Sequence, residues 1–451
     1  MDTASGHVVI VGGGASGTLL ATTILRERPD LRVTLIEKRG EVGRGFAYGE
    51  AQPFHLLNVR ASNLSAYAGE PRHFVDWLDR NGVEENVTGS GTFRFAPRAV
   101  YGRYLSEQLK EATAAAPGRF TLARGSATTL ERESGSVCVH LEDGQPITAD
   151  AAVIATGYEP PRFSSIARGH TAWSGFSGRQ LEEVETALII GTGHTAVDHI
   201  QWLIAAGFEG RIIAISRHGW LPLVHKPVEP LGIDPADVPF GARVSRLLRW
   251  FRARDTAAAA HEIDWRAVID GMRPHAQSLW QTLPVAEQRR FIRHVRAWYD
   301  VRRHRMAPSI ADALDGLIAV GRIEIIAGKI ESIASPAPGA PSVAVTYRRR
   351  GQRVRTELDV EMIIDCTGFS LDVRRSTNQL IRSLIAQGLA RPNRHALGFD
   401  VDASCRLIDS DGTAAGNMYA IGPLTRGQFW EATGIPDIRK QCADLANAIA
   451  R

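Results

Sequence analysis

Two segments of the chain share one pattern of apolar and polar positions. In each, a short apolar run is followed by closely spaced glycines and then by apolar residues at helical spacing. The apolar runs cover residues 8–11 and 187–190. Short, β-branched runs of this kind are typical of strands buried on both faces of a parallel sheet. The pattern therefore predicts two strand–turn–helix units, each with a glycine turn at the carboxyl end of its strand.

The first unit has the features of a dinucleotide-binding turn. Its three spaced glycines would permit a sharp exit from the strand, a close approach of pyrophosphate to the backbone, and tight packing of the helix. The N–H groups at the helix start would face the phosphates. A second apolar run, residues 31–36, ends in an acid that is expected to hold a ribose hydroxyl. The alternative is a turn that packs and binds nothing. The predicted cofactor-binding residues here are Gly12, Gly14, Ala15, Ser16, Gly17, Glu37 and Lys38.

The second unit repeats the pattern with two differences. Ala196 replaces the third glycine, and the next apolar run, residues 211–215, is followed by no acid. Arg217 stands there instead, where it would pair with a 2′-phosphate and favour NADPH over NADH. A solvated cation at a strand end is the competing interpretation. His194 would touch the pyrophosphate or have no ligand role. The predicted cofactor-binding residues are Gly191, Gly193, His194, Thr195 and Arg217.

The remaining pattern indicates a duplication with an insertion. After each unit comes an alternating, hairpin-like region and a strand that ends in Thr-Gly-aromatic, at residues 156–158 and 367–369. Between the halves, helical spacing predicts helices over residues 242–254, 265–270, 272–281 and 285–305. We expect an α/β fold with two Rossmann-like dinucleotide-binding domains, β-meanders and a helical insertion. The expected segments are 1–160 and 369–451 for the first domain, 161–226 and 312–368 for the second, and 227–311 for the insertion.

Composition excludes several classes of protein. The 451 residues carry a net charge of +4, but 48 arginines stand against 5 lysines with no lysine-rich block, so no nucleic-acid partner is expected. No targeting segment or membrane-spanning stretch is apparent, which predicts a cytoplasmic protein without membrane contact. The four cysteines are widely spaced, so neither a metal site, a disulfide framework nor a redox-active dithiol is expected.

Further segments carry a family resemblance. They are residues 43–48, 55–59, 97–105, 298–305 and 422–427, together with Trp430 and Glu431. With the two glycine turns, they resemble the FAD/NAD(P)-binding flavoprotein family typified by the bacterial protein YdhS. That family is related to the flavin-containing and N-hydroxylating monooxygenases. The resemblance covers nearly the whole chain and implies FAD at the first turn.

The resemblance also implies roles for individual residues. Arg44 would reach the phosphate or ribose of FAD, and Asn58 would line the face of the flavin as the best candidate for a catalytic group. Many related flavoproteins have Gly-Asp where this chain has Gly422-Pro423, so the contact to the ribityl chain must come from elsewhere, such as the backbone. A helix start at Ile435 would stabilise charge on the reduced flavin. The further cofactor-binding residues predicted are Arg44, Thr156, Gly157, Thr367, Gly368, Gly422, Pro423 and Ile435.

The last helix expected in the insertion ends in a cluster of basic residues. Arg302 and Arg305 are spaced to share one helix face, and His304 lies between them. These three residues would bind a carboxylate or phosphate of substrate or NADPH. The alternative for this cluster is a solvated basic helix end. The insertion as a whole is expected to be either a substrate cap or a structural or dimer-forming element.

These features predict a flavin enzyme. The leading hypothesis is an NADPH-dependent FAD monooxygenase that hydroxylates a small polar substrate with O2 through a flavin C4a-hydroperoxide. An NAD(P)H-dependent flavin reductase or dehydrogenase that passes electrons to a quinone or partner protein is the second. A non-catalytic flavin-binding redox sensor is the third, and a homodimer is compatible with each.

Overall fold

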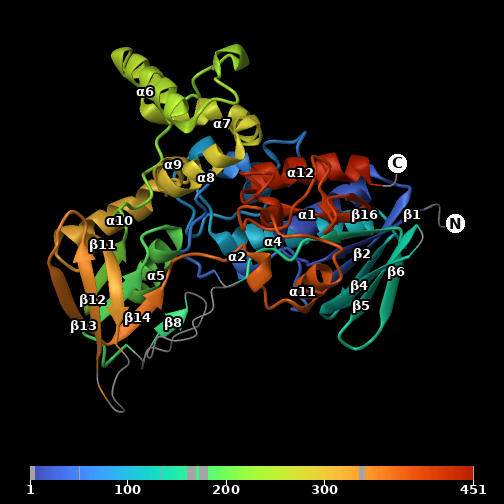
Figure 1. The fold of residues 1–451 in the computed structure, drawn as a ribbon, viewed down its shortest axis with the longest axis horizontal. Helices are drawn as coiled ribbons and strands as arrows, with labels where there is room; N and C mark the ends of the chain where they lie inside the picture. The colour runs from blue at the N-terminus through green and yellow to red at the C-terminus, as the bar shows by residue number, and fades with distance from the viewer. Residues whose placement is uncertain are drawn as a thin grey trace.

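The computed structural model describes residues 6–49, 51–133, 135–159, 169–171, 181–334, 340 and 342–449. Figure 1 shows two sheets side by side, with a group of helices standing above the junction between them. Strands of the first sheet come from residues 6–154 and 406–420, and strands of the second from residues 169–216 and 323–365. The expected boundary between residues 160 and 161 lies outside the described residues.

The first sheet has six strands, in the order β15-β16-β7-β1-β2-β3. All neighbours are parallel except β15 and β16. Its bounds are β1 Gly6–Val11, β2 Leu31–Glu37, β3 Phe120–Arg124, β7 Ala151–Ile154, β15 Arg406–Ile408 and β16 Ala414–Ala420. The central strands β1 and β7 are almost fully buried, which explains their unbroken apolar runs.

Helices and a small antiparallel sheet complete this domain. Helix α1 packs against both α4 and α12, and α11 packs against the small sheet β4-β5-β6. The bounds are α1 Ala15–Glu27, α2 Gly45–Gly49, α3 His73–Arg80, α4 Arg98–Ala114, α11 Gln379–Ala386, α12 Ile435–Ala448, β4 Ala127–Glu133, β5 Ser136–Leu141 and β6 Pro146–Ala149. Single turns of 3₁₀ helix cover Ala61–Asn63, Gly91–Phe93, Pro235–Asp237, Val373–Arg375 and Gly422–Thr425.

The second sheet has seven strands, in the order β13-β12-β11-β10-β9-β14-β8. The neighbouring strands β8, β14, β9, β10 and β11 are parallel to one another, and β11, β12 and β13 form the antiparallel meander. The bounds are β8 Gly169–Thr171, β9 Thr186–Ile190, β10 Arg211–Ser216, β11 Ile323–Ile333, β12 Val343–Arg349, β13 Arg355–Val360, β14 Met362–Asp365, α5 His194–Ala205 and α10 Pro308–Ala319. Two parallel α/β sheets, each with a glycine turn at a central strand, confirm the predicted fold class.

The insertion consists of four helices, which project from the junction of the two sheets (Figure 1). They are α6 Val244–Ala260, α7 Trp265–Thr282, α8 Val285–His294 and α9 Arg296–Arg303. The break expected at Gly271 is wrong. A Cβ at Gly271 would overlap the carbonyl group of Leu231, so this glycine serves close packing inside a continuous helix.

The single helix expected over residues 285–305 is also wrong. The helix is interrupted at Val295, which keeps a distorted helical conformation with φ of −115° and ψ of −31° and has its side chain buried in the apolar core of the insertion, and α9 ends at Arg303. Arg305 lies beyond that end, so Arg302 and Arg305 do not share one helix face. Packing of the buried Val295 side chain in this cluster accompanies the distortion, so tertiary contacts modify the local helical pattern here.

Candidate functional site

The first glycine turn has the geometry of a close backbone approach. Gly12 has φ of 109°, and a Cβ there would lie 2.6 Å from the carbonyl oxygen of Ala155. A Cβ at Gly17 would overlap the carbonyl oxygen of Gly12, so α1 packs directly on the turn. Gly14 caps α1 without a side-chain hydrogen bond. The first N–H groups of α1 thus lack a side-chain acceptor and can bind an anion.

Two further segments close around this turn. The N–H of Gly43 donates to the carbonyl oxygen of Gly13 at 2.8 Å, which lays the loop before α2 over the turn. A Cβ at Gly422 would lie against the hydroxyl of Ser16, and Gly422 has φ of 68°. The Gly422-Pro423 segment therefore meets the first turn of α1. Arg44 lies in the covering loop and pairs with Glu41 at 3.0 Å on the surface.

Glu37 is held by the backbone of the turn. One carboxylate oxygen accepts from the N–H of Gly13 at 2.8 Å and the other from the N–H of Arg39 at 2.8 Å. A cavity of about 450 Å³ opens beside it and is lined by Gly12, Glu37, Lys38 and Thr156 among others. The hydroxyl of Thr156 is buried there without a hydrogen-bond partner among the described residues. A ribose with its phosphates would fit this polar cavity and supply that partner.

The second turn repeats this geometry with different chemistry. Gly191 has φ of 118°, and a Cβ there would overlap the carbonyl group of Cys366. The hydroxyl of Thr192 lies 2.8 Å from that of Ser216, which takes the place that Glu37 has in the first turn. The next residue, Arg217, is exposed and forms no ion pair with any described residue.

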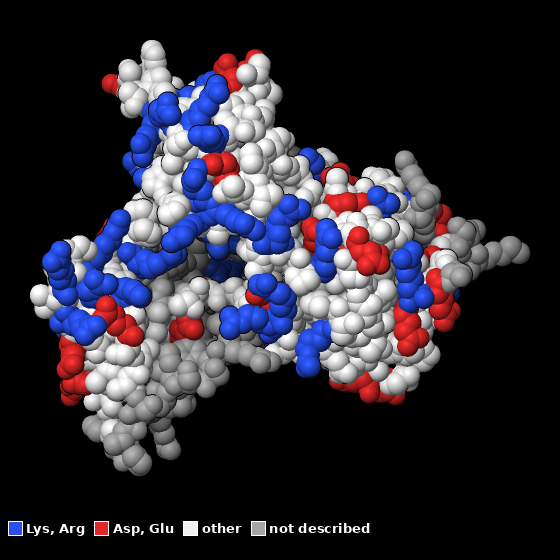
Figure 2. All heavy atoms as spheres, in the orientation of Figure 1, with Lys and Arg blue, Asp and Glu red and all other residues white. Residues whose placement is uncertain are grey.

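Basic and aromatic groups surround Arg217. His218 stacks on Trp220, with ring centroids 4.4 Å apart, and its Nδ1 accepts from the guanidinium of Arg350 at 3.1 Å. Burial and the two nearby guanidinium groups lower the pKa of His218 below its ordinary value. Figure 2 shows Lys and Arg side chains along the hollow between the insertion and the sheets on this face. This surface favours an anionic ligand.

The two Thr-Gly ends meet where the chain crosses between the domains. Tyr158 and Phe369, the aromatic residues that follow them, stack with centroids 4.7 Å apart and an interplanar angle of 19°. Glu159 and Ser370 form an antiparallel bridge beside them. The repeated Thr-Gly-aromatic pattern thus builds one paired crossover between the two glycine turns.

An ion pair also joins the two domains. Arg98, at the start of α4, forms two hydrogen bonds with Asp198 of α5, at 2.5 and 3.1 Å. His55 contacts the carbonyl oxygen of Asp198 at 3.1 Å. Both side chains of the ion pair are mostly buried, with 18% and 13% of their surfaces exposed. The contact fixes the first domain against the helix that follows the second glycine turn.

The start of the insertion lies against the segment around Asn58. The carbonyl oxygen of Asn58 accepts from His225 at 3.0 Å, while the amide side chain is half-buried and has no hydrogen-bond partner among the described residues. Burial lowers the pKa of His225 to about 3, so this ring is neutral. Asn58 is thereby fixed through its backbone, with its side chain available.

A polar pocket of about 670 Å³ lies between α7, α9 and the start of α12. Its charged and polar lining residues come from both the first domain and the insertion. They are Arg60, Asn63, Asp270, Arg273, His275, Arg303, Glu431 and Asp437. The pocket therefore combines guanidinium groups with carboxylates at one place, and it adjoins the predicted helix start at Ile435.

The carboxylates of this pocket differ in their partners. Glu431 accepts from the Tyr299 hydroxyl at 2.6 Å and pairs with Arg303 at 3.0 Å, so the ion pair holds its pKa below the ordinary value despite burial. Asp437 has one oxygen buried without a partner among the described residues. Burial and the nearby Glu431 raise the pKa of Asp437 to about 6. Arg273 forms no ion pair with a described residue and is largely buried.

The structure gives the predicted substrate residues different polar partners, although Arg302 and Arg305 both lie 5.9 Å from the centre of the Trp265 ring. Arg305 forms a buried ion pair with Asp270, and Arg302 lies over the ring of Trp298 at 4.3 Å. His304 offers its carbonyl oxygen to the ring of His194, at 2.8 Å. This contact occupies one ring nitrogen of His194 at the start of α5. Arg305 keeps two buried nitrogens without partners among the described residues, so it retains capacity for a further acceptor.

Sequence reasoning missed the polar pocket, including the three residues Glu431, Arg273 and Asp437. Glu431 lies in a segment that carried the family resemblance, but nothing in its spacing indicated a partner. Arg273 and Asp437 stand in ordinary amphipathic helices. The one available signal was the acid at the third position of α12, where a carboxylate is common for helix stability alone.

Comparisons with known proteins agree with this geometry. Residues 9–159 match the family model described as FAD-NAD(P)-binding. An uncharacterised protein of Mycobacterium tuberculosis is 24% identical, over 98% of this chain and 95% of its own length. The FAD-bound cadaverine monooxygenase of Erwinia amylovora has a TM-score of 0.67 at 11% identity, over 98% of this chain and 94% of its own. L-lysine 6-monooxygenase of Pseudomonas syringae has a TM-score of 0.62 at 14% identity, over 98% of both chains.

The fold is that of a two-domain FAD- and NAD(P)-binding flavoprotein. This confirms the expected flavoprotein class and its two cofactors, with the first turn inside the matched region. Structural similarity to N-hydroxylating flavin monooxygenases supports the resemblance in part. Within the described residues no helix is long and apolar enough to cross a bilayer, and no cluster of potential metal ligands occurs.

Proposed function

We propose that this protein is an FAD- and NADPH-dependent monooxygenase of the flavoprotein family typified by YdhS, and that it acts on a small polar substrate. The observation that carries the proposal is the mixed-charge pocket at the start of α12, between the FAD-binding domain and the insertion. Bound FAD, reduced by NADPH, would supply the activation of O2. The chain's own residues would bind the cofactors, orient the substrate and exclude water.

The charges of the pocket indicate the substrate's own groups. Glu431 and the partnerless oxygen of Asp437 suit an ammonium group, while Arg60 and Arg273 suit a carboxylate. The similar structures are named as monooxygenases of cadaverine and L-lysine, both amines. We therefore infer a small aliphatic amine or amino acid as substrate, hydroxylated at a nitrogen or carbon.

The second turn supports NADPH as the reductant. Ser216 replaces the acid that would repel a 2′-phosphate, and Arg217 follows it without an ion pair to the described chain. The Tyr158–Phe369 crossover joins this turn to the FAD site. We further infer a cytoplasmic enzyme.

The experiment supplies the FAD-loaded protein with NADPH, ¹⁸O2 and a panel of aliphatic amines and amino acids. The expected result is substrate-dependent NADPH oxidation and one ¹⁸O atom in an organic product, measured by mass spectrometry. Asp437→Asn should weaken substrate binding, whereas Asp444→Asn on the exposed side of α12 should not. Full conversion of O2 to peroxide with every substrate would favour the reductase. No reduction of the flavin by NADPH or NADH would rule out both enzymes.

A further inference from the structure

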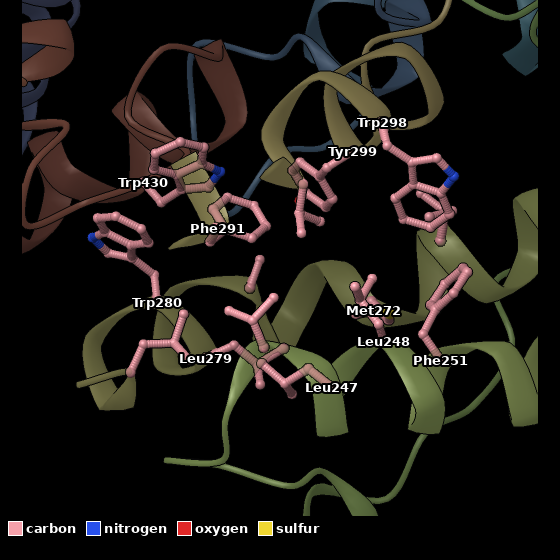
Figure 3. Close-up of a pocket in the computed structure, with 15 residues that line it drawn as sticks. Leu247, Leu248, Phe251, Met272, Leu279, Trp280, Phe291, Trp298, Tyr299 and Trp430 are labelled. Carbon is pink, nitrogen blue, oxygen red and sulfur yellow. The ribbon is translucent and has the colours of Figure 1, made fainter. Parts of the chain in front are cut away.

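The helices of the insertion line a second cavity, which is separate from the polar pocket. Helices α6, α7, α8 and α9 surround it together with Trp430 (Figure 3). Helix α7 forms the wall between the two. Its residues Ile269 and Met272 face the second cavity, whereas Asp270 and Arg273 face the polar pocket. The second cavity is therefore a site of its own.

The lining of this cavity is apolar throughout. All fifteen lining residues are hydrophobic or aromatic. Two of the aromatic groups use their polar atoms elsewhere: Trp280 donates to the carbonyl oxygen of Gly427 at 2.9 Å, and Tyr299 donates to Glu431 at 2.6 Å. In Figure 3 the indole nitrogen of Trp298 also points away from the cavity. A ligand inside would meet carbon surfaces.

The size and the apolar walls of the cavity restrict what can occupy it. Its volume is about 90 Å³. Val244, Ile269 and Trp280 are at most 3% exposed, whereas Leu248 and Phe291 are only half-buried, so the cavity is partly open to solvent. Apolar cavities of about 150 Å³ stay dry and bind benzene. Water would find no hydrogen-bond partners here, and a peptide would leave its backbone groups unpaired. A short alkyl chain or a small ring meets neither difficulty.

We propose that the insertion binds the uncharged, apolar end of a small molecule, of about the size of a short alkyl chain, in this cavity. Trp280, Trp298 and Trp430 would contact it, and a polar end would remain at the mouth. This assignment is independent of the redox reaction, since it concerns a cavity on the far side of α7 from the polar pocket.

The experiment uses the tryptophans of the cavity as reporters on the FAD-loaded protein. The probe is 6-bromo-1-hexanol, whose bromine quenches indole fluorescence when the chain enters. Saturable quenching that 1-hexanol reverses is expected. The control, 1,6-hexanediol, has the same chain with a second hydroxyl, which would have to enter the dry cavity, so it should compete at least tenfold more weakly.

Two variants locate the site. Ala276→Phe fills the cavity from α7 and should abolish saturable quenching, while Ala253→Phe, on an exposed position of α6 that does not line the cavity, should leave it unchanged. If Ala276→Phe does not fold, Leu248→Phe fills the half-buried side instead. All measurements omit NADPH, so failure of the proposed monooxygenase reaction would not affect them.

Three results would overturn the proposal. The first is quenching that rises linearly with probe concentration, because it reflects collisions alone. The second is quenching that both filled variants retain, because the probe then binds elsewhere. The third is a dimer in light scattering that Ala276→Phe converts to monomers, because a side chain of a second copy then fills the cavity.

Discussion

Arg217 and Asp437 are the two residues whose chemistry most directly bears on the proposed reaction. Arg217 is exposed at the end of β10, beside a turn that has a serine in place of an acid. Asp437 lies in the first turn of α12 with one oxygen buried and without a partner among the described residues. Arg217 offers a positive charge for a phosphate, and Asp437 has a carboxyl group whose burial disfavours its ionised form.

Arg217→Ala should raise the KM for NADPH far more than the KM for NADH. Loss of an Arg–phosphate contact costs about 1.5–3 kcal/mol, which corresponds to about a ten- to hundred-fold change. Steady-state kinetics with both nucleotides measures the effect, and Arg252→Ala, an exposed arginine of α6, is the control. Equal changes for the two nucleotides would show that Arg217 does not contact the 2′-phosphate.

Asp437→Asn should stabilise the protein in a pH-dependent way. The folded protein holds the Asp437 proton more tightly than the unfolded chain does, because its pKa rises from 3.8 to about 6. Its contribution to the free energy of unfolding therefore falls as pH rises from about 4 to about 6, by about 3 kcal/mol. The variant should gain that amount at pH 8 and only about 0.5 kcal/mol at pH 4.

Urea unfolding of both proteins at pH 4 and pH 8 tests this expectation. The difference between variant and wild type is the quantity to follow, because it cancels the opposite contributions of His225 and His304. Burial lowers the pKa values of these histidines to about 3 and about 4, so their contributions rise with pH. If the difference in free energy of unfolding between the variant and the wild type stays constant with pH, the pKa of Asp437 is not raised by folding.

At the scale of elements, α9 is the helix that ties the insertion to the rest of the molecule. Tyr299 and Arg303 of α9 both bind Glu431, which precedes α12. The residue after α9, His304, receives the ring of His194 from α5. Residues of the basic cluster predicted to bind substrate thus connect α9 to α5 and to the segment before α12.

Glu431→Gln should destabilise the insertion strongly, because it leaves the buried Arg303 without its countercharge. Breaking one partner of a buried ion pair costs about 3–5 kcal/mol. Tyr299→Phe removes only the hydrogen bond and should cost less, about 1.5–3 kcal/mol. Urea unfolding gives both values, and limited proteolysis should cut the Glu431→Gln variant first within α6–α9. Equal losses in the two variants would mean that the Arg303 charge is solvated.

At the scale of the whole molecule, two contacts hold the glycine turns in one arrangement. The Tyr158–Phe369 stack joins the crossovers, and the Arg98–Asp198 pair joins α4 to α5. The ion pair is the one that a single substitution can remove without disturbing either turn. It therefore tests whether the relative placement of the domains matters for electron transfer.

Arg98→Ala should slow reduction of the bound FAD by NADPH while FAD itself stays bound. The mostly buried Asp198 would lose its charged donor, at a cost of about 1.5–3 kcal/mol in stability. Stopped-flow absorbance measures the reduction rate, and the ratio of flavin to protein measures FAD retention. Arg103→Ala removes an exposed arginine from the same helix as a control. An unchanged reduction rate would show that the pair stabilises the fold without positioning the turns.

The sequence by itself determined the two strand–turn–helix units, because their glycines and buried strands are local requirements. Gly12 and Gly191 could be recognised from spacing alone, and the meanders and Thr-Gly-aromatic ends followed from alternation. The sites expected at these turns depend on backbone geometry that a short segment encodes. Which individual side chains contact the cofactors at the two glycine turns remains a prediction.

Only the tertiary structure determined the contacts between distant segments and the positions of the pockets. The spacing around Gly271 predicts a helix break, but the backbone of Leu231 packs against this glycine inside a continuous helix, and Arg305 has a buried partner in Asp270 that its spacing did not indicate. Glu431 meets Arg303 across 128 positions of sequence, at 3.0 Å. Such partners come from chain segments distant in sequence, and their pairing depends on packing and burial, which local periodicity does not encode.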